Sequence, residues 1–589
     1  MKWNGRTRAA FVCVFFALLF SVFSWRLIYL QMVMHQYYSE LAAEKNVGRD
    51  VIPAQRGAIY DAHHEVLAQN VPVDTIVADA TLIDNPGALV PILASQLHLP
   101  ASDIAEKISS HRPYIVLKRD VPDMDARALE KTLHDQKLRG IRCEPGSVRF
   151  YPNGSMLCHV LGFTDFHQHG VQGVEASMDQ YLRGEDGYRY VEHDARGREI
   201  VLYRGLEHPP RDGFQVSLTI DLNLQTIVEN ELDAAMRDYR PQKATIILMQ
   251  PQTGEILAMA NRPNFDLNAI SEAKPVQMKN RAIIDMMEPG STFKIVTAAA
   301  ALNERKVRPD TMIFCENGVW NIGGRPLHDH GHKGYGDLSV RDILVHSSNI
   351  GAAKMACMLG EMKFYEYIRR FGFGERTGIE LPGEIRGMVH PPRTWSKISI
   401  TRIPMGQEVG VTPLQMIMAM ATIANGGKLV QPRIVKSITD DQGKVRSALK
   451  PTVVRQVISR QTASEVAYAL RGVVSKRGTA AEAAVPGYII SGKTGTAQKA
   501  APGGGYEKNK YIVSFSGFLP SENPAFVGLV VLDDAHPKDP NLNYGGTVAG
   551  PIFSRVAEQA ARYLDLAPQE DLETPAKTAG RVALTDASP

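Results

Sequence analysis

Apolar positions are arranged differently in successive stretches of the chain. At its start, the run from Ala9 to Trp25 carries no charge, Arg26 interrupts it, and Leu27 to Met34 is again mostly apolar. A run of this length predicts one transmembrane helix, with Arg26 near the far interface, where its stem can reach along the apolar surface. A cleaved signal peptide and a buried soluble helix are the alternatives, but the run is long and no small-residue cleavage site follows it.

The charges ahead of this run predict its orientation. Lys2, Arg6 and Arg8 precede it, and basic flanks tend to stay on the cytoplasmic side. We therefore expect a single-pass protein of the cytoplasmic (inner) membrane, with residues 1–34 as cytoplasmic tail and anchor. The chain beyond about residue 35 is then exported to the periplasm.

Residues 35–220 show short apolar runs between many turn residues. Arg56–Asp61 predicts a strand that enters a turn, Gly170–Gly187 a turn, a helix and a second turn, and Gln215–Asp221 an alternating strand. No pairing of a nucleophile with a base is apparent in this part. We expect an extended, non-catalytic pedestal.

Residues 221–566 have the order of an α+β domain, with a helix at 222–237 and helical periods through much of 338–426. Strands at both ends predict an antiparallel sheet flanked by helices, and the polar residues 567–589 predict a disordered tail. The predicted strands are Ala244–Gln250, Ile256–Ala260, Tyr488–Lys499, Tyr511–Leu519 and Ala525–Asp533, and the last helix is Pro551–Leu564.

One helix start in this domain carries candidate chemistry. Pro289 and Gly290 break the preceding element, and Ser291 and Lys294 then fall on one face of an Ala-rich helix. A buried lysine whose pKa is lowered can take the proton of a serine nucleophile. Ser-x-x-Lys also occurs at Ser271 and Ser447, about as often as chance predicts, but only the Ser291 copy opens a long apolar helix.

Two further motifs strengthen this weak signal. Ser347-Ser348-Asn349 lies in a helical segment, and Lys493-Thr494-Gly495-Thr496 lies on the first late strand. Each motif is common by itself. The ordered set of three, on a helix start, a helical segment and a strand of one domain, predicts a serine acyl-transfer site.

Composition excludes some classes of function. The net charge of +3 gives no case for a nucleic-acid surface. Five scattered cysteines demand no disulfide among Cys143, Cys158, Cys315 and Cys357. Cys315, His328, Asp329, His330 and His332 cluster in sequence, but their spacing matches no standard zinc site, so we expect a polar loop beside the cleft, and neither metal nor cofactor.

The three motifs resemble those of the penicillin-recognising active-serine enzymes, whose transpeptidase domain has a serine β-lactamase-like fold. The pedestal segments Arg56–Asp61, Arg149–Pro152 and Gly170–Gly184, and Met405–Gln415 in the catalytic domain, are similar to class B penicillin-binding proteins. The resemblance implies a peptidoglycan D-Ala-D-Ala transpeptidase that β-lactams acylate.

The resemblance also implies a role for each motif residue. Ser291 is the nucleophile, Lys294 its base, and Lys493 a second cation that keeps Lys294 neutral. Ser347 passes a proton to the leaving D-alanine and Asn349 holds the peptide. Substrate binding falls to Ser348, Thr494, Gly495 and Thr496, the threonines for the terminal carboxylate and Gly495 for close approach of the strand to the ligand. The backbone N–H groups of Ser291 and Thr496 form the oxyanion hole.

Several readings remain open within and beyond this family. Phe371–Gly374 and Pro382–Glu384 look more like the division (septal) type than the elongation type. The division type implies, as partner, a polytopic glycosyltransferase of the shape, elongation, division and sporulation family, with other membrane proteins of the division machinery. A carboxypeptidase, a β-lactamase, and a membrane-anchored sensor that binds β-lactam or wall peptide without turnover are the rival functions.

Overall fold

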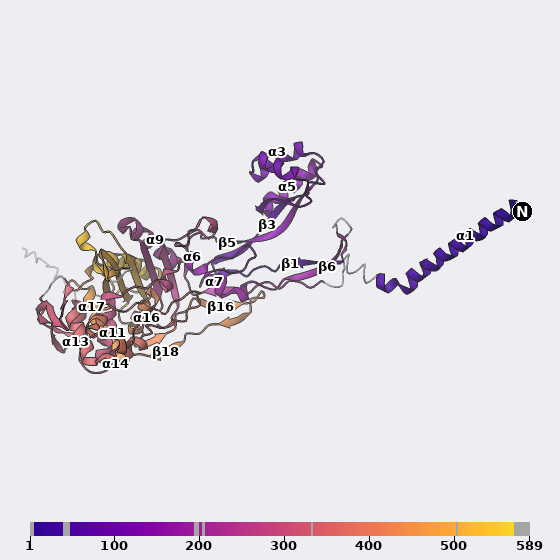
Figure 1. Ribbon diagram of the computed structural model, residues 1–589. Coiled ribbons are helices and arrows are strands. Elements are labelled where there is room, and N and C mark those ends of the chain that lie inside the picture. Colours follow the sequence, from indigo (N-terminus) through magenta and orange to yellow (C-terminus); the bar gives the residue numbers. More distant parts are fainter. Residues whose placement is uncertain are drawn as a thin grey trace, which may run out of the picture. The chain divides into compact units, whose positions relative to one another are not determined.

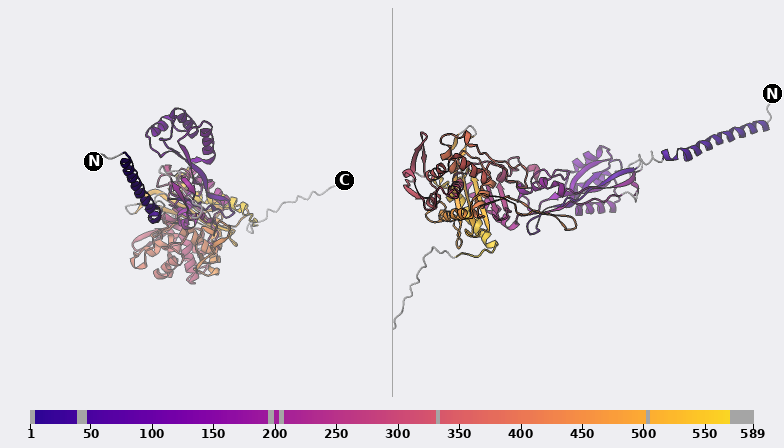
Figure 2. Two further views of the ribbon diagram at one scale, coloured as in Figure 1. Left: turned by 90° about the vertical axis from the view of Figure 1, so that its right-hand side faces the viewer. Right: turned by 90° about the horizontal axis from the view of Figure 1, so that it is seen from below.

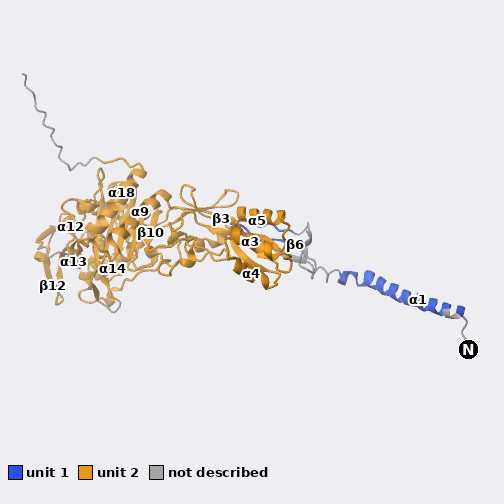
Figure 3. Cartoon of the chain, turned by 90° about the horizontal axis from the view of Figure 1, so that it is seen from above, with its two compact units in different colours: residues 1–55, 183–213 blue, residues 56–182, 214–589 orange. Residues whose placement is uncertain are grey.

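The computed structural model describes residues 5–38, 47–193, 199–202, 207–330, 334–501 and 505–569. The chain divides into two compact units, residues 1–55 with 183–213 and residues 56–182 with 214–589 (Figure 3). Most of the predicted tail, 570–589, lies outside the described residues.

The first unit contains the predicted anchor and a small sheet. Helix α1 (Gly5–Ile28) continues into a π-helical turn, Tyr29–Val33. Ala9–Val33 is long and apolar enough to cross a membrane, and none of its strongest 18-residue window is buried by other described residues. Strands β1 (Val47–Ile52), β6 (Gly187–His193) and β7 (Glu199–Leu202) pair in the antiparallel order β1-β6-β7.

The second unit begins with a seven-stranded sheet that gathers strands from distant parts of the sequence. Its path is β17-β16-β8-β2-β3-β4, and β5 pairs with β3. Two members, β16 and β17, come from within the predicted catalytic segment, so the sheet crosses the predicted boundary at residue 220. The strands are β2 (Ile59–Tyr60), β3 (Val66–Ala78), β4 (Ile115–Pro122), β5 (Ile141–Phe150), β8 (Gln215–Leu218), β16 (Val435–Thr439) and β17 (Val445–Ala448).

Three helices form a separate small core on this sheet. Their apolar faces enclose Leu89, Leu93, Ile104 and Leu129, all 1% exposed or less. The helices are α3 (Pro86–Leu97), α4 (Ala101–Ser109) and α5 (Asp123–Asp135) (Figure 1). The sequence pattern did not predict these three helices.

The central sheet of the catalytic segment has the predicted antiparallel form, in the order β10-β9-β21-β20-β19. Every residue of β21 is buried, so helices cover both faces, as Figure 1 and Figure 2 show around the yellow strands. The strands are β9 (Lys243–Met249), β10 (Ile256–Arg262), β19 (Ser491–Ala500), β20 (Tyr506–Leu519) and β21 (Phe526–Asp533).

The covering helices form two groups. Helices α9 (Leu222–Tyr239) and α18 (Gly550–Tyr563) pack against each other and the sheet, where Phe515 meets Phe553 with ring centroids 4.7 Å apart. The other group carries the first two motifs. It contains α11 (Lys294–Asn303), α12 (Val340–Val345), α13 (Asn349–Leu359), α14 (Glu361–Arg370), α16 (Pro413–Ala424) and α17 (Arg460–Val474).

The remaining described elements are short. Small α-helices are α6 (Cys158–Leu161), α7 (Gly173–Ser177), α8 (Asp179–Leu182), α10 (Arg281–Ile284) and α15 (Ser399–Arg402). Small two-stranded sheets pair β11 (Met312–Phe314) with β14 (Asp337–Ser339), β12 (Val319–Ile322) with β13 (Arg325–His328), and β15 (Lys428–Val430) with β18 (Val453–Gln456).

Candidate active site

Ser291 stands in a short 3-10 turn, Gly290–Phe293, that leads directly into α11. Gly290 has a φ of 58°, which a residue without Cβ adopts at low cost. A Cβ at Gly290 would lie 3.1 Å from the carbonyl oxygen of Thr496, so the turn packs closely on β19. The nucleophile candidate is therefore held beside the strand that carries the third motif.

Lys294 brings the first two motifs together. Its Nζ contacts the Ser347 carbonyl oxygen at 2.5 Å, Ser347 Oγ at 3.1 Å and Asn349 Oδ1 at 2.7 Å. The side chain is 0% exposed, and this burial lowers the pKa of Lys294 to about 7. Within the described residues no hydrogen bond joins Lys294 to the Ser291 hydroxyl, one turn before it.

Lys493 approaches the same hydroxyl from β19. Its Nζ lies 3.0 Å from Ser347 Oγ, and the pKa of Lys493 is lowered well below its ordinary value by burial and then by the charge of Lys294. Ser347 carries one hydrogen, so it can donate to only one of the two amines, and only to a neutral one. Burial is the main cause of both lowered pKa values, and the second cation adds to it for Lys493.

The Ser347 backbone is held in an uncommon conformation. It links α12 to α13 with a φ of 58°, a left-handed value that few non-glycine residues adopt. Such strain persists where the surroundings fix it, and it often marks functional sites. Here it turns the Ser347 hydroxyl toward both lysines.

Ser348, a predicted substrate-binding residue, is buried at the start of α13. It is 1% exposed and caps α13, because its hydroxyl accepts a hydrogen bond from Gly351 N at 3.0 Å. The same hydroxyl donates to the Asp329 carboxylate at 3.0 Å. These contacts make Ser348 part of the support at the start of α13.

Residues of the third motif also contact other parts of the fold. Thr494 Oγ1 lies 3.0 Å from Thr479 Oγ1, and Thr496 Oγ1 accepts from Gly545 N at 3.1 Å. A Cβ at Gly495 would lie 2.3 Å from Ser514 Oγ and 2.9 Å from the Pro289 carbonyl oxygen. The absence of a side chain at Gly495 thus allows β19 to pack closely on the Ser291 turn.

Sequence reasoning missed Asp329 as a site residue. Its carboxylate is 2% exposed and accepts from Ser348 Oγ, Asn349 N and Ile350 N. It had been weighed only as one member of a possible zinc cluster. The spacing of a distant capping residue follows no motif, so only the fold reveals it.

The possible zinc cluster does not assemble as a ligand set in the described part of the chain. Cys315 is buried and points toward the Ile313 carbonyl and Ser348, and Asp329 caps α13. His332 lies outside the described residues. Among the residues that are described, no three His, Cys, Asp or Glu side chains form a group that could hold a metal ion.

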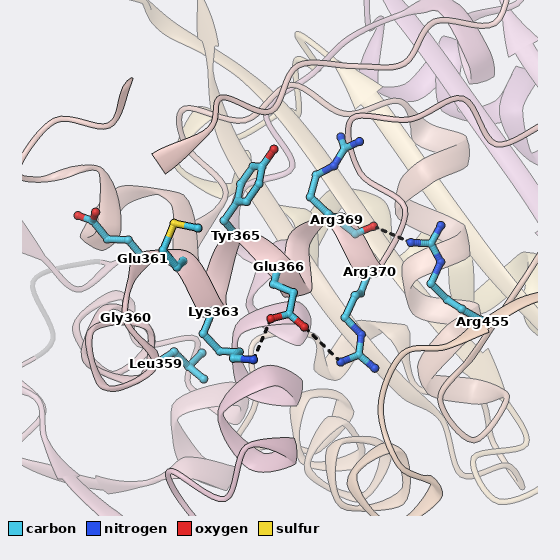
Figure 4. A pocket seen from close by; sticks show the side chains of 10 residues that line it. Leu359, Gly360, Glu361, Lys363, Tyr365, Glu366, Arg369, Arg370 and Arg455 are labelled. Atoms are coloured by element: carbon cyan, nitrogen blue, oxygen red, sulfur yellow. Dashed lines mark hydrogen bonds and ion pairs between the residues drawn. The ribbon is translucent and has the colours of Figure 1, made fainter. Parts of the chain in front are cut away.

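A surface depression lies elsewhere, on α14. Its volume is about 990 Å³, and Tyr365, Glu366, Arg369, Arg370 and Arg455 help to line it (Figure 4). None of the nine predicted site residues takes part. Glu366 pairs there with Lys363 at 2.8 Å and with Arg370 at 3.8 Å.

The assembled groups suit acyl transfer. A serine stands on a turn beside β19, and one hydroxyl is shared by two buried amines, at least one of which must be neutral to accept its proton. A proton can therefore move between these amines through Ser347 without passing through water.

Comparison with known proteins finds matches along almost the whole chain. The penicillin binding protein transpeptidase domain matches residues 244–558, and the penicillin-binding protein dimerisation domain matches residues 51–218. Stage V sporulation protein D of Bacillus subtilis is 34% identical over 570 residues, which cover 96% of this chain and 87% of that protein. Peptidoglycan D,D-transpeptidase FtsI of Escherichia coli K12 is 30% identical, with 94% and 91% covered.

Solved structures agree with this assignment. Penicillin binding protein 3 of Mycobacterium tuberculosis, in complex with ampicillin, superposes with a TM-score of 0.69 at 28% identity. The match covers 89% of this chain and 99% of that one. With a dimerisation domain followed by a transpeptidase domain, this chain belongs to the class B penicillin-binding proteins.

Proposed function

We propose that the protein is a peptidoglycan D-Ala-D-Ala transpeptidase that crosslinks stem peptides through an acyl-enzyme on Ser291. The observation that carries the proposal is the position of Ser347 Oγ, 3.1 Å from Lys294 Nζ and 3.0 Å from Lys493 Nζ. A protein that only bound wall peptide would not need this proton-handling set. The family membership and the name of the E. coli relative support the same activity.

In the first half-reaction, Ser291 Oγ attacks the carbonyl carbon of the penultimate D-alanine while neutral Lys294 takes the hydroxyl proton. The C–N bond to the terminal D-alanine then breaks, and the proton passes through Ser347 to the leaving amine. The oxyanion is stabilised by the Ser291 and Thr496 backbone N–H groups, and Lys493 attracts the terminal carboxylate. A second stem peptide's amine then attacks the ester and regenerates Ser291. β-Lactams acylate the same serine.

The wild-type chain and Ser291→Ala test this proposal side by side. The expected result is a penicillin adduct on the Ser291 peptide by mass spectrometry and formation of crosslinked dimers from stem-peptide substrates. Ser291→Ala should lose both while its melting temperature stays unchanged. Labelling that persists in Ser291→Ala would remove the nucleophile assignment, rapid penicillin hydrolysis would favour a β-lactamase, and acylation without peptide turnover a sensor.

We also propose a membrane topology and a cellular role for the protein. The protein is inserted with its N-terminus in the cytoplasm, its catalytic segment acts in the periplasm, and it works at the septum with a polytopic division glycosyltransferase. The basic residues ahead of the apolar run and the relatives FtsI and stage V sporulation protein D support this reading. Depletion should give filaments, whereas round cells would favour the elongation role.

A further inference from the structure

Asp329 holds the N-terminus of the helix that carries the second motif. Its carboxylate accepts from Asn349 N at 2.6 Å, from Ile350 N at 3.1 Å and from Ser348 Oγ at 3.0 Å to each oxygen. These four contacts use both oxygens of a side chain that is 2% exposed. A helix N-terminus attracts an anion, so this contact stabilises α13 at its first turn.

The segment 328–329 also fixes which way the Asn349 amide points. Asn349 Nδ2 donates to the His328 carbonyl oxygen at 2.9 Å, which leaves Oδ1 facing Lys294 Nζ at 2.7 Å. The Asn349 backbone N–H is held by Asp329 at the same time. The Nδ2 end of the amide and the start of its helix are therefore held by two consecutive residues, His328 at the end of β13 and Asp329 directly after it.

Asp329 also supplies the negative charge of a site that holds two lysines. Lys294 and Lys493 are both 0% exposed and share Ser347 Oγ. The charged groups that act on Lys294 are Lys493 on β19 and Asp329 on the loop after β13, together with the positive end of α13. Burial lowers the pKa of Lys294 to about 7, and the Asp329 carboxylate opposes this effect by raising the pKa.

We propose that Asp329 is a positioning residue of the acyl transfer, which orients Ser347 and Asn349 through the start of α13 and provides the counter-charge of the two-lysine cluster. The inference rests on the proposed function for its catalytic meaning. Asp329 itself touches neither Lys294 Nζ nor Ser291 by hydrogen bond among the described residues. It acts through Ser348 and Asn349 and through its charge.

Asp329→Asn in the full-length, detergent-solubilised chain separates charge from shape, since the amide oxygen still accepts hydrogen bonds. We expect the acid limb of the penicillin acylation rate to move to lower pH by about one unit, because the neutral form of Lys294 is favoured. The rate on the high-pH plateau should fall by about tenfold or more, because the amide cannot satisfy Ser348, Asn349 and Ile350 together. An acid limb of the acylation rate that stays in place, or moves to higher pH, would overturn the counter-charge role of Asp329. An unchanged rate on the high-pH plateau would overturn its positioning role.

Asp440→Asn is the matched control. Asp440 is also 2% exposed and accepts from Lys444 N at 2.7 Å and Gln442 N at 3.1 Å, but it caps the β16–β17 turn and contacts none of the three motifs. Asp440→Asn should leave both the acid limb and the high-pH plateau of the acylation rate as they are in the wild type. If Asp329→Asn does not fold, Asp329→Glu takes its place, because it keeps the charge but moves it. The acylation rate of Asp329→Glu on the high-pH plateau must still fall.

A second readout keeps this inference separate from the proposed function. Carbon-13 NMR of the lysine ε carbons, assigned with Lys294→Met, follows the Lys294 titration in the full-length chain without any acylation. If the wild type takes no penicillin at Ser291, the proposed function fails, while the NMR titration still tests Asp329. A Lys294 midpoint that does not fall in Asp329→Asn would overturn the inference even in an active enzyme.

Discussion

Lys294 has lost the water that normally solvates an ammonium group, and this loss decides its chemistry. Its pKa is lowered from 10.5 to about 7, with burial as the largest cause. A base is most useful near the pH at which it works, so the side chain is suited to take the Ser291 proton at neutral pH.

The first prediction at this scale concerns pH. Penicillin acylation of the wild type should rise with pH through about 7, and below that midpoint fall about tenfold per pH unit, because the protonated amine cannot act as base. Stopped-flow acylation rates across pH 5–9 provide the measurement. Lys294→Ala should lose several orders of magnitude in rate, and near-normal acylation in that variant would shift the base role elsewhere.

The same pKa also affects stability. The folded protein releases the Lys294 proton near pH 7, whereas the unfolded chain keeps it up to about 10.5. The unfolded state therefore binds more protons between these values, and the contribution of Lys294 to stability becomes more favourable as pH rises. The charged form is the costly one in the folded state.

At the scale of elements, close packing between β19 and the Ser291 turn positions the site. Gly495 is the point of contact, since a Cβ there would meet Ser514 Oγ, the Pro289 carbonyl and Thr292 Cγ2 within 3.0 Å. Two of these neighbours belong to the segment that begins α11. The strand and the turn are thereby fixed against each other.

Gly495→Ala should separate these two elements. We expect a loss of about 1–3 kcal/mol in unfolding free energy from overpacking and a larger proportional loss of acylation. Thermal unfolding and penicillin labelling measure the two effects. Gly87→Ala is the control, because a Cβ there meets only Asn85 Oδ1 at 3.7 Å, and it should leave both unchanged. Full acylation by Gly495→Ala would contradict the packing role.

A buried ion cluster joins three elements of the second unit near β2, β5 and α7. Glu175 is 0% exposed and accepts from Arg56 Nε and Arg149 Nε, each at 2.7 Å. Tyr151 donates to the same carboxylate at 3.4 Å. Removing one member of such a cluster leaves buried charge without a partner.

Glu175→Ala should therefore cost about 3–5 kcal/mol, because two buried guanidinium groups lose their shared carboxylate. Urea unfolding of the full-length chain measures the loss. The exposed pair Glu185–Arg211, 3.6 Å apart, offers the control, and Glu185→Ala should cost less than about 1 kcal/mol. Equal losses in the two variants would contradict the importance of burial.

At the scale of the whole molecule, the apolar span is separable from the catalytic core. None of the strongest apolar window of α1 is buried by other described residues, and the core that surrounds the three motifs runs from Ile59 to Ala561. The described members of this core all belong to the second unit.

A chain that begins after residue 38 should be soluble without detergent and should acylate with penicillin at a rate within about twofold of the full-length protein. Size-exclusion chromatography and labelling provide the test. A truncated chain that aggregates, or that folds but loses acylation, would contradict the separation of anchor from catalytic segment.

The sequence was sufficient for those features that local pattern determines. Apolar run length predicted the span that became α1, and apolar runs between turn residues predicted β9, β10, β20 and β21 to within a few residues at most ends. Turn residues beside an Ala-rich run located the start of α11. Motif order identified the family, because Ser-x-x-Lys, Ser-x-Asn and Lys-Thr-Gly each tie a residue type to one kind of element.

Only the tertiary structure decided the relations between distant segments. It joined β16 to β8 across more than two hundred residues of sequence, turned Ser348 toward Asp329, and gave Gly495 a packing role. Burial, and with it the charge of Lys294 and Lys493, depends on which segments meet around a side chain. Periodicity along the chain specifies which face of an element is apolar, but not which distant carboxylate or amine comes to lie against it.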